Sequence, residues 1–301
     1  MFARTILVVT SLQGNHTALG LQSSSSFVQS TQEFNVTYGT GTVGGLLCQD
    51  HVNIAGLELM NHTFGIAIAE SMVFASDATP FDGIMGFAQS VRSSCCTSVF
   101  TTYLAVQKLS QERVLTPVES LAANNLIQAP IASFKIPRLA DQLNDGEVTL
   151  GGLDATKFIN DSLVTFPNVN NMGFWEGGID AVMVNGTSTG LTGRTAILDT
   201  GTTLILAPPA DAQKVVESLG GTCDTQQCTV PCTIGTSLAL SFGNASFPID
   251  PRDLATFPID LNDASGNCTA GIQPQLIGAA TEWLVSGAHF ILLDHGFQRS
   301  I

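Results

Sequence analysis

Residues 196–206 read Ala196-Ile197-Leu198-Asp199-Thr200-Gly201-Thr202-Thr203-Leu204-Ile205-Leu206, and this stretch is the most informative part of the 301-residue chain. Two apolar runs enclose a short polar segment, which predicts a strand, a tight turn with Asp199 at its tip, and a second strand. A buried carboxylate that hydroxyl groups and glycine amides hold at such a turn is suited to acid–base chemistry. That chemistry usually needs a second carboxylate beside the first, and the sequence contains no second Asp-Thr-Gly.

The composition is that of a β-rich globular protein. Apolar residues make up 44% of the chain and charged residues only 12%, a balance that argues against disorder and against a coiled coil. A chain of this length usually divides into two domains. The formal net charge of −14 repels phosphate groups, so we expect no binding to nucleic acid or to anionic membranes. No apolar run approaches the ~20 residues of a membrane span.

Potential N-glycosylation sites are frequent in this sequence. The motif Asn-X-Ser/Thr occurs seven times, more often than the Ser and Thr content predicts by chance. The excess favours a chain that passes through a secretory compartment, and the alternative is a Ser- and Thr-rich chain with accidental motifs. The seven asparagines are Asn15, Asn35, Asn61, Asn160, Asn185, Asn244 and Asn267.

The seven cysteines also favour a secretory compartment, where disulfides form. The N-terminus, in contrast, is not a convincing signal peptide. The apolar core Ile6–Val9 is too short for a signal peptide, and no small-X-small cleavage site follows it. Two disulfide pairs are plausible, Cys223 with Cys228 and Cys232 with Cys268. The remaining three cysteines are Cys48, Cys95 and Cys96, so one thiol should stay unpaired.

Many short strands and few helices are predicted, which indicates an all-β architecture. Alternation within residues 23–37 predicts a strand that leads through the glycine-rich turn Tyr38–Gly41 into a second strand at 42–47, as in a hairpin. A helix is expected at 117–125, with Thr116 as N-cap and Glu119 at the third helical position. Further strands are expected at 51–54, 57–60, 63–68, 147–150, 238–242 and 247–249, a helix at 210–219, and a buried run at 81–86.

Taken in order, these segments resemble a pepsin-like aspartic endopeptidase (family A1) of the type that fungi secrete, over roughly residues 23–290. The chain shows the landmarks of that family in the family's order. They are a flap-like turn at Tyr38–Gly41, a hydrophobic-hydrophobic-Gly crossing at 81–86, an interlobe strand at 146–154, an aromatic strand entry at Phe174-Trp175, the Asp-Thr-Gly loop, and Cys232 and Cys268 at the position of a second-lobe disulfide.

The resemblance implies an all-β, bilobal acid-protease fold with a few short helices. It implies an incomplete N-terminal lobe, 1–165, with the flap hairpin, and a C-terminal lobe, 166–301, with the Asp-Thr-Gly loop and without its closing strands. It further implies a secreted monomer that cleaves peptide or protein substrates at acidic pH, through a water molecule between two aspartates, without a cofactor or metal. The implied site comprises Asp199 as catalytic acid, Thr200, Gly201 and Thr202 as its support, and Tyr38, Gly39 and Thr40 as the flap.

The sequence departs from the family pattern near both ends. In the family, a first catalytic Asp follows an apolar strand ahead of the flap, whereas here Ile6–Val9 leads to Thr10. Residues 283–290 resemble the second lobe's hydrophobic-hydrophobic-Gly segment, with Ser286 where Gly is usual, and residues 291–301 do not resemble the closing strands. We therefore expect a family member truncated at both ends and inactive as written.

Two other hypotheses remain at this stage. Thr10 motivates one of them, a non-catalytic peptide-binding or inhibitory homologue. A weaker idea is a homodimer in which each chain contributes Asp199. The residues also have plainer interpretations: Asp199 as the cap of a turn, Tyr38 as a core aromatic of a hairpin, and Asp82 as a structural turn residue. The five histidines show no metal-ligand spacing and are interpreted as structural or exposed.

Overall fold

The computed structural model describes residues 16–38, 41–79, 81–90, 114–159 and 161–286. The chain forms two compact units, which are described one at a time. Unit 1 takes its described residues from Met1–Ala132, Leu150–Gly152 and Asn171–Phe174, and unit 2 from Ser133–Thr149, Leu153–Asn170 and Trp175–Ile301. The division into lobes 1–165 and 166–301 is coarser than this one and stays a prediction.

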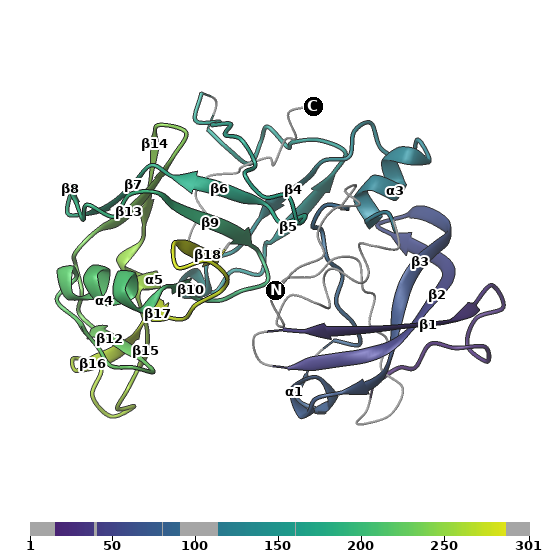
Figure 1. The fold of residues 1–301 in the computed structure, drawn as a ribbon, viewed down its shortest axis with the longest axis horizontal. Helices are drawn as coiled ribbons and strands as arrows, with labels where there is room; N and C mark the ends of the chain where they lie inside the picture. The colour runs from purple at the N-terminus through teal and green to yellow at the C-terminus, as the bar shows by residue number, and fades with distance from the viewer. Residues whose placement is uncertain (1–15, 39–40, 80, 91–113, 160, 287–301) are drawn as a thin grey trace. The chain divides into compact units, whose positions relative to one another are not determined.

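Unit 1 is built on an antiparallel three-stranded sheet, which Figure 1 shows as three adjacent ribbons. The predicted hairpin is confirmed, because its two strands pair from Thr37 with Thr42 back to Val28 with Gln49. The strands run further than the sequence pattern indicated: 51–54 continues the second strand, and 57–60 and 63–68 join into one. The strands are β1 (Val28–Thr37), β2 (Thr42–Ile54) and β3 (Leu57–Glu70).

One face of this sheet is buried, as the alternation in the sequence requires. Phe34, Val36 and Tyr38 are 3%, 2% and 5% exposed and pack with Val43 and Phe74. The helix α3 (Pro117–Ala123) begins with the predicted capping box: the Glu119 amide donates to Thr116 Oγ1, and the Thr116 amide donates to Glu119 Oε2. A short helix, α1 (Met72–Ala75), follows β3.

The buried run predicted at 81–86 is confirmed only in its second half, where Ile84 and Met85 pack against core clusters and Gly86 is buried. In the first half the prediction is wrong, because Phe81 is 41% exposed and Asp82 is exposed as well.

Asp82 pairs with the His16 ring at 3.1 Å and also accepts hydrogen bonds from Thr17. The paired imidazole lowers the pKa of Asp82, and the carboxylate raises the pKa of His16. The apolar residues and glycines of this segment gave no sign of the contact between Asp82 and His16.

Unit 2 contains a five-stranded and two four-stranded sheets among its described residues. The five-stranded sheet, in the order β17-β10-β18-β9-β6, consists of β6 (Glu176–Ile179), β9 (Arg194–Asp199), β10 (Ile205–Ala207), β17 (Ile272–Pro274) and β18 (Glu282–Ser286). The other two consist of β7 (Ala181–Val184), β8 (Thr187–Ser188), β13 (Leu238–Phe242) and β14 (Ala245–Ile249), and of β11 (Thr222–Cys223), β12 (Cys228–Pro231), β15 (Ala255–Pro258) and β16 (Asn267–Ala270). The strands predicted at 238–242 and 247–249 are confirmed.

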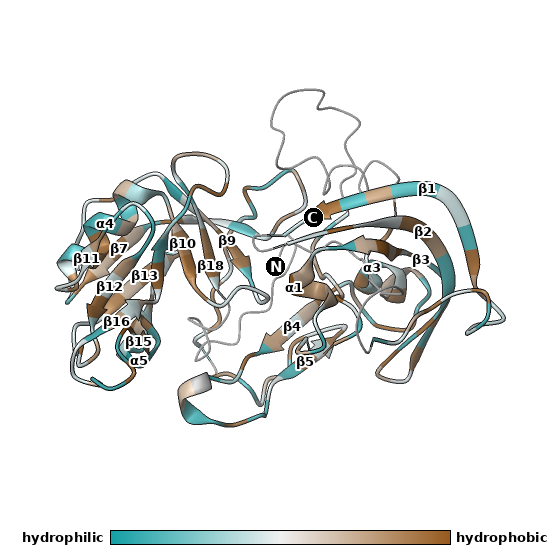
Figure 2. Cartoon of the chain, turned by 90° about the horizontal axis from the view of Figure 1, so that it is seen from below, coloured by the Kyte–Doolittle hydropathy of each residue, from teal (hydrophilic) through white to brown (hydrophobic). Residues whose placement is uncertain are grey.

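The core of unit 2 lies between these sheets and the helix α4 (Pro209–Ser218), which confirms the predicted helix to within a residue at each end. In Figure 2 the strands β10 and β18 are largely brown, the colour of hydrophobic residues. Trp283 of β18 is fully buried, and its indole N–H donates to Asp211 Oδ2 at 3.0 Å. Arg194 of β9 pairs with the same carboxylate through two hydrogen bonds of 2.9 and 2.7 Å. This buried charge is therefore paired and bonded, as a stable core requires.

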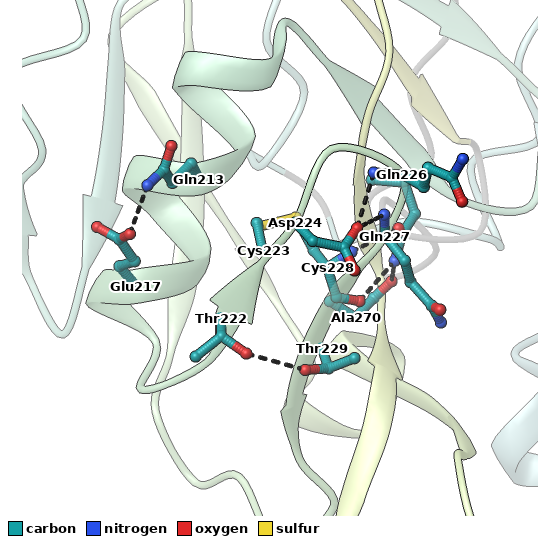
Figure 3. Close-up of a disulfide and its surroundings, with 11 residues drawn as sticks. Gln213, Glu217, Thr222, Cys223, Asp224, Gln226, Gln227, Cys228, Thr229 and Ala270 are labelled. Carbon is teal, nitrogen blue, oxygen red and sulfur yellow. Dashed lines mark hydrogen bonds between the residues drawn. A yellow bond between two sulfur atoms is a disulfide. The ribbon is translucent and has the colours of Figure 1, made fainter.

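Both candidate disulfides are present. Cys223 and Cys228 join β11 to β12, close to the hydrogen bond between the hydroxyls of Thr222 and Thr229 (Figure 3). The second, Cys232–Cys268, spans 36 residues of sequence. Since the stabilisation from the unfolded chain grows with loop length, the longer bridge contributes about 4 kcal/mol and the shorter one about 2 kcal/mol. The Cys48 thiol is free and buried, and Cys95 and Cys96 lie outside the described residues.

A short two-stranded sheet pairs β4 (Ala132–Lys135) with β5 (Glu147–Leu150), in agreement with the predicted strand at 147–150. The 3-10 helix η1 (Leu139–Asp141) and the helix α5 (Pro251–Leu254) complete unit 2. Arg138 is 8% exposed and lies 2.8 Å from the Asp253 carboxylate and 3.3 Å from that of Asp250. The charge of Arg138 thus ties the β4–β5 segment to the α5 turn.

Glu70 and His62 of unit 1 each have buried side-chain atoms that lack hydrogen-bond partners among the described residues. Both carboxylate oxygens of Glu70, the last residue of β3, are buried in this way, as is Nε2 of His62. Burial raises the pKa of Glu70 and lowers that of His62 from 6.5 to about 4, because it disfavours the charged form of each. Each group is therefore compatible with the fold chiefly when neutral.

Replacing Glu70 with Gln should make unit 1 more stable than the wild type at neutral pH but not in acid. A raised folded pKa contributes stability below the ordinary glutamate value of 4.5, and that contribution is lost as the pH rises through the folded pKa. The variant's advantage should grow by up to about 1.4 kcal/mol for each pH unit in that window. Hydrogen exchange of β2 and β3 amides, corrected for intrinsic rates and followed from about pH 4 to about pH 7, measures it.

The matched control is Glu58→Gln on the same sheet, where Glu58 is exposed. Its effect on stability gives the baseline for replacing an exposed carboxylate of this sheet with an amide, and the pH dependence of Glu70→Gln is compared with it. Titration of His62 acts in the opposite direction but is common to all three proteins, so it cancels. A flat difference for Glu70→Gln would show that the carboxylate of Glu70 is not buried without a partner.

Candidate active-site loop

The five-stranded sheet of unit 2 places Asp199 at the end of a central strand. β9 lies between β18 and β6, and Asp199 is its last residue. The apolar residues Ala196 and Ile197 are 0% and 2% exposed, so the strand is fixed by burial up to the point where the polar turn begins. Asp199 itself is 8% exposed. The strand predicted before the turn is confirmed, and β10 is the strand predicted after it.

The turn holds the Asp199 carboxylate from both sides. The Gly201 amide donates to Oδ1 at 3.0 Å, and the Thr202 hydroxyl donates to Oδ2. The Thr202 amide also donates a hydrogen bond to the Asp199 carbonyl, at 3.4 Å. Donors of this kind favour the ionised form of a carboxyl group and fix its orientation. The structure therefore brings Gly201 and Thr202 to Asp199, whereas Thr200 is exposed.

A second strand contributes a hydrogen bond to the turn. β18 runs parallel to β9, and its residue Ser286 lies opposite Asp199 in the register. Ser286 is fully buried, and its hydroxyl donates to the Thr202 carbonyl. The sequence identified Ser286 only as a departure from Gly. Its contact depends on the strand register, which no local pattern of residues encodes.

The hairpin of unit 1 carries the other predicted site residues. The Tyr38 amide donates to the Gly41 carbonyl at 2.7 Å, which closes the turn. The Tyr38 ring packs edge-on against Phe74, with centroids 5.3 Å apart, and its buried hydroxyl has no hydrogen-bond partner among the described residues. Burial raises the pKa of Tyr38. Gly41 is required here, because a Cβ atom would lie 2.8 Å from the Phe74 ring. Gly39 and Thr40 lie outside the described residues.

The described part of the chain contains no group of His, Cys, Asp and Glu side chains that could hold a metal ion. It also has no helix that is both long and apolar enough to cross a membrane.

Thr10, where the resemblance places the partner of Asp199, lies outside the described residues, as do His289 and His295.

Comparison with known proteins agrees with the fold and the loop. The model of the family described as eukaryotic aspartyl protease matches residues 8–293. The chain is 32% identical over 274 residues to the aspartic-type endopeptidase ctsD of Aspergillus fumigatus, covering 90% of this chain and 52% of that protein. It is 30% identical over 275 residues to the probable aspartic-type endopeptidase CTSD of Arthroderma benhamiae, covering 90% and 49%. It is also 32% identical over 282 residues to rhizopuspepsin-1 of Rhizopus niveus, covering 92% and 66%.

The chain thus spans about half to two thirds of the length of these relatives. The family match extends over both units and includes the Asp199 loop, the hairpin and the disulfide-linked strands. The all-β architecture that the resemblance implied is confirmed as well. This chain belongs to the eukaryotic aspartyl protease family.

Proposed function

We propose that Asp199 is a catalytic carboxylate of an aspartic-type endopeptidase site that acts on peptide or protein substrates in acid. The observation that supports this proposal most is the environment of Asp199. The side chain is 8% exposed, and Gly201 and Thr202 donate to its two oxygens. A carboxylate fixed in this way can take a proton from a water molecule and return it without reorienting. Family membership supplies the substrate class.

Aspartic proteases are the reference case of two carboxylates, about 3 Å apart, that share a single proton. The ionised carboxylate takes a proton from a water molecule, and the protonated one donates to the carbonyl of the scissile peptide. In this scheme Thr202 orients Asp199, and Tyr38, Gly39 and Thr40 of the hairpin cover the substrate. Hydrolysis then passes through a tetrahedral intermediate without a covalent bond to the enzyme.

We further propose that the chain, as its sequence stands, hydrolyses peptides very slowly. Thr10 occupies the position where the resemblance places the first aspartate, and a threonine hydroxyl cannot share a proton with Asp199 in this way. Removing one acid–base partner costs about 10²–10⁴-fold in rate, and more when two groups act as a unit. A second candidate function follows from the same residue: a monomeric homologue that binds peptides without cleaving them.

Cleavage of a denatured protein substrate at about pH 3–5 separates these functions. We expect the purified chain to cleave no faster than its Asp199→Asn variant, because one carboxylate alone gives little catalysis. Thr10→Asp should raise the rate by at least about 10²-fold, and the double variant with Asp199→Asn should lose that gain. Rapid cleavage by the wild type that depends on Asp199 would show that the second acid is supplied elsewhere. Absence of any gain in Thr10→Asp would favour the non-catalytic homologue.

We also propose that the protein is a secreted glycoprotein. Each sequon asparagine that the structure describes is exposed: Asn35, Asn61, Asn185, Asn244 and Asn267. Two of them lie in tight turns between strands, where Asn185 has φ 48° and Asn244 has φ 67°. The Asn185 side chain is held at the surface by the Ser237 amide, which donates to Oδ1 at 3.1 Å. A glycan at either turn would project into solvent without disturbing the core.

Secretion from a eukaryotic host followed by N-glycosidase treatment tests this proposal. We expect a loss of mass and conversion of Asn185 and Asn244 to Asp at the released sites. The control Thr187→Ala keeps Asn185 but destroys its sequon, so it should abolish the modification there and leave Asn244 unaffected. A secreted protein whose mass is unchanged by the glycosidase would contradict the proposal.

A further inference from the structure

The strand pairing of unit 2 brings an unexpected hydroxyl group to the Asp199 loop. β18 pairs with β9 in a continuous parallel register from Glu282 with Thr195 to Ser286 with Asp199. The register places Ser286 beside the turn, although 87 positions separate it from Asp199 in the sequence (286 − 199). Ser286 is fully buried, so its hydroxyl requires a hydrogen-bond partner within the protein.

Hydrogen bonds connect Ser286 to the Asp199 carboxylate through a single residue. The Ser286 hydroxyl donates to the carbonyl oxygen of Thr202. The hydroxyl of the same Thr202 donates to Asp199 Oδ2. Ser286 therefore fixes the backbone of the residue whose side chain holds the carboxylate. Buried hydrogen bonds of this kind are costly to break, because each group left behind loses its partner away from water.

We propose that Ser286 is a positioning residue for Asp199, which acts by fixing Thr202. The hydrogen bond from Ser286 restrains the Thr202 peptide. Because the backbone of Thr202 is fixed, its hydroxyl stays directed at Asp199 Oδ2. Glycine, which the family resemblance leads one to expect at this position, would lack the donor. This chain thus has a support for its active-site loop that depends on its own residue at 286. The inference deepens the proposed function, since it assigns a role toward Asp199.

Titration of the Asp199 carboxyl carbon by ¹³C NMR tests the proposal without requiring catalysis. Asp199→Asn assigns the resonance in protein labelled at the aspartate carboxyl groups. In Ser286→Ala the loosened Thr202 hydroxyl supports the ionised form less well, so the titration midpoint should rise by about 0.5 pH unit, a roughly threefold gain in proton affinity. Thr202→Val should raise it as well. The double variant should match Thr202→Val alone, because Ser286 acts only through that hydroxyl.

Ser241→Ala is the matched control, since Ser241 is a buried serine of β13 in the same unit. It should leave the midpoint unchanged. Two outcomes would overturn the proposal: a wild-type midpoint in Ser286→Ala, or a Ser286→Ala effect that adds in full to that of Thr202→Val. Failure of the proposed function gives a different signature. In that case the titration effects of Ser286→Ala persist, while no variant that contains Thr10→Asp cleaves peptides.

Discussion

The parallel pairing of β18 with β9 is the constraint on which the site depends. β9 alone would end in a carboxylate on a flexible turn. Its pairing with β18 buries Trp283 against the core, where the indole meets the Asp211 carboxylate, and it sets Ser286 against the turn. Because the strands are in fixed register, the same ladder that stabilises unit 2 also orients Asp199. Stability and site geometry are therefore coupled through one strand pair.

Local chemistry in the sequence accounts for much of the fold. Alternation predicted the buried face of the hairpin, and the capping box that begins at Thr116 is present with both of its hydrogen bonds. Residues 196–206 form the strand, turn and strand that their polarity pattern predicts. Each of these features depends on residues that lie close together in the sequence. Both pairs of cysteines joined by disulfides were also candidates from the sequence.

Contacts between distant residues were not predictable in the same way. Asp82, at the exposed start of the 81–86 segment, pairs with His16, and the bond from Ser286 to Thr202 arises from strand register. The Glu70 carboxylate, which is buried without a hydrogen-bond partner among the described residues, gives no local signal either, because it ends an otherwise ordinary strand. A sequence pattern states which side chains are apolar and where turns fall. It does not state which polar groups meet across the fold.

The proposed function rests on the claim that Asp199 presents a fixed carboxylate to the peptide bond of a substrate. The most direct measurement is calorimetry with two peptides that differ only in a central hydroxyl group, which mimics the tetrahedral intermediate. We expect the hydroxyl to strengthen binding to the wild-type chain, and we expect Asp199→Asn to remove this gain while the hydroxyl-free peptide binds as before. An equal gain from the hydroxyl in both proteins would contradict the claim.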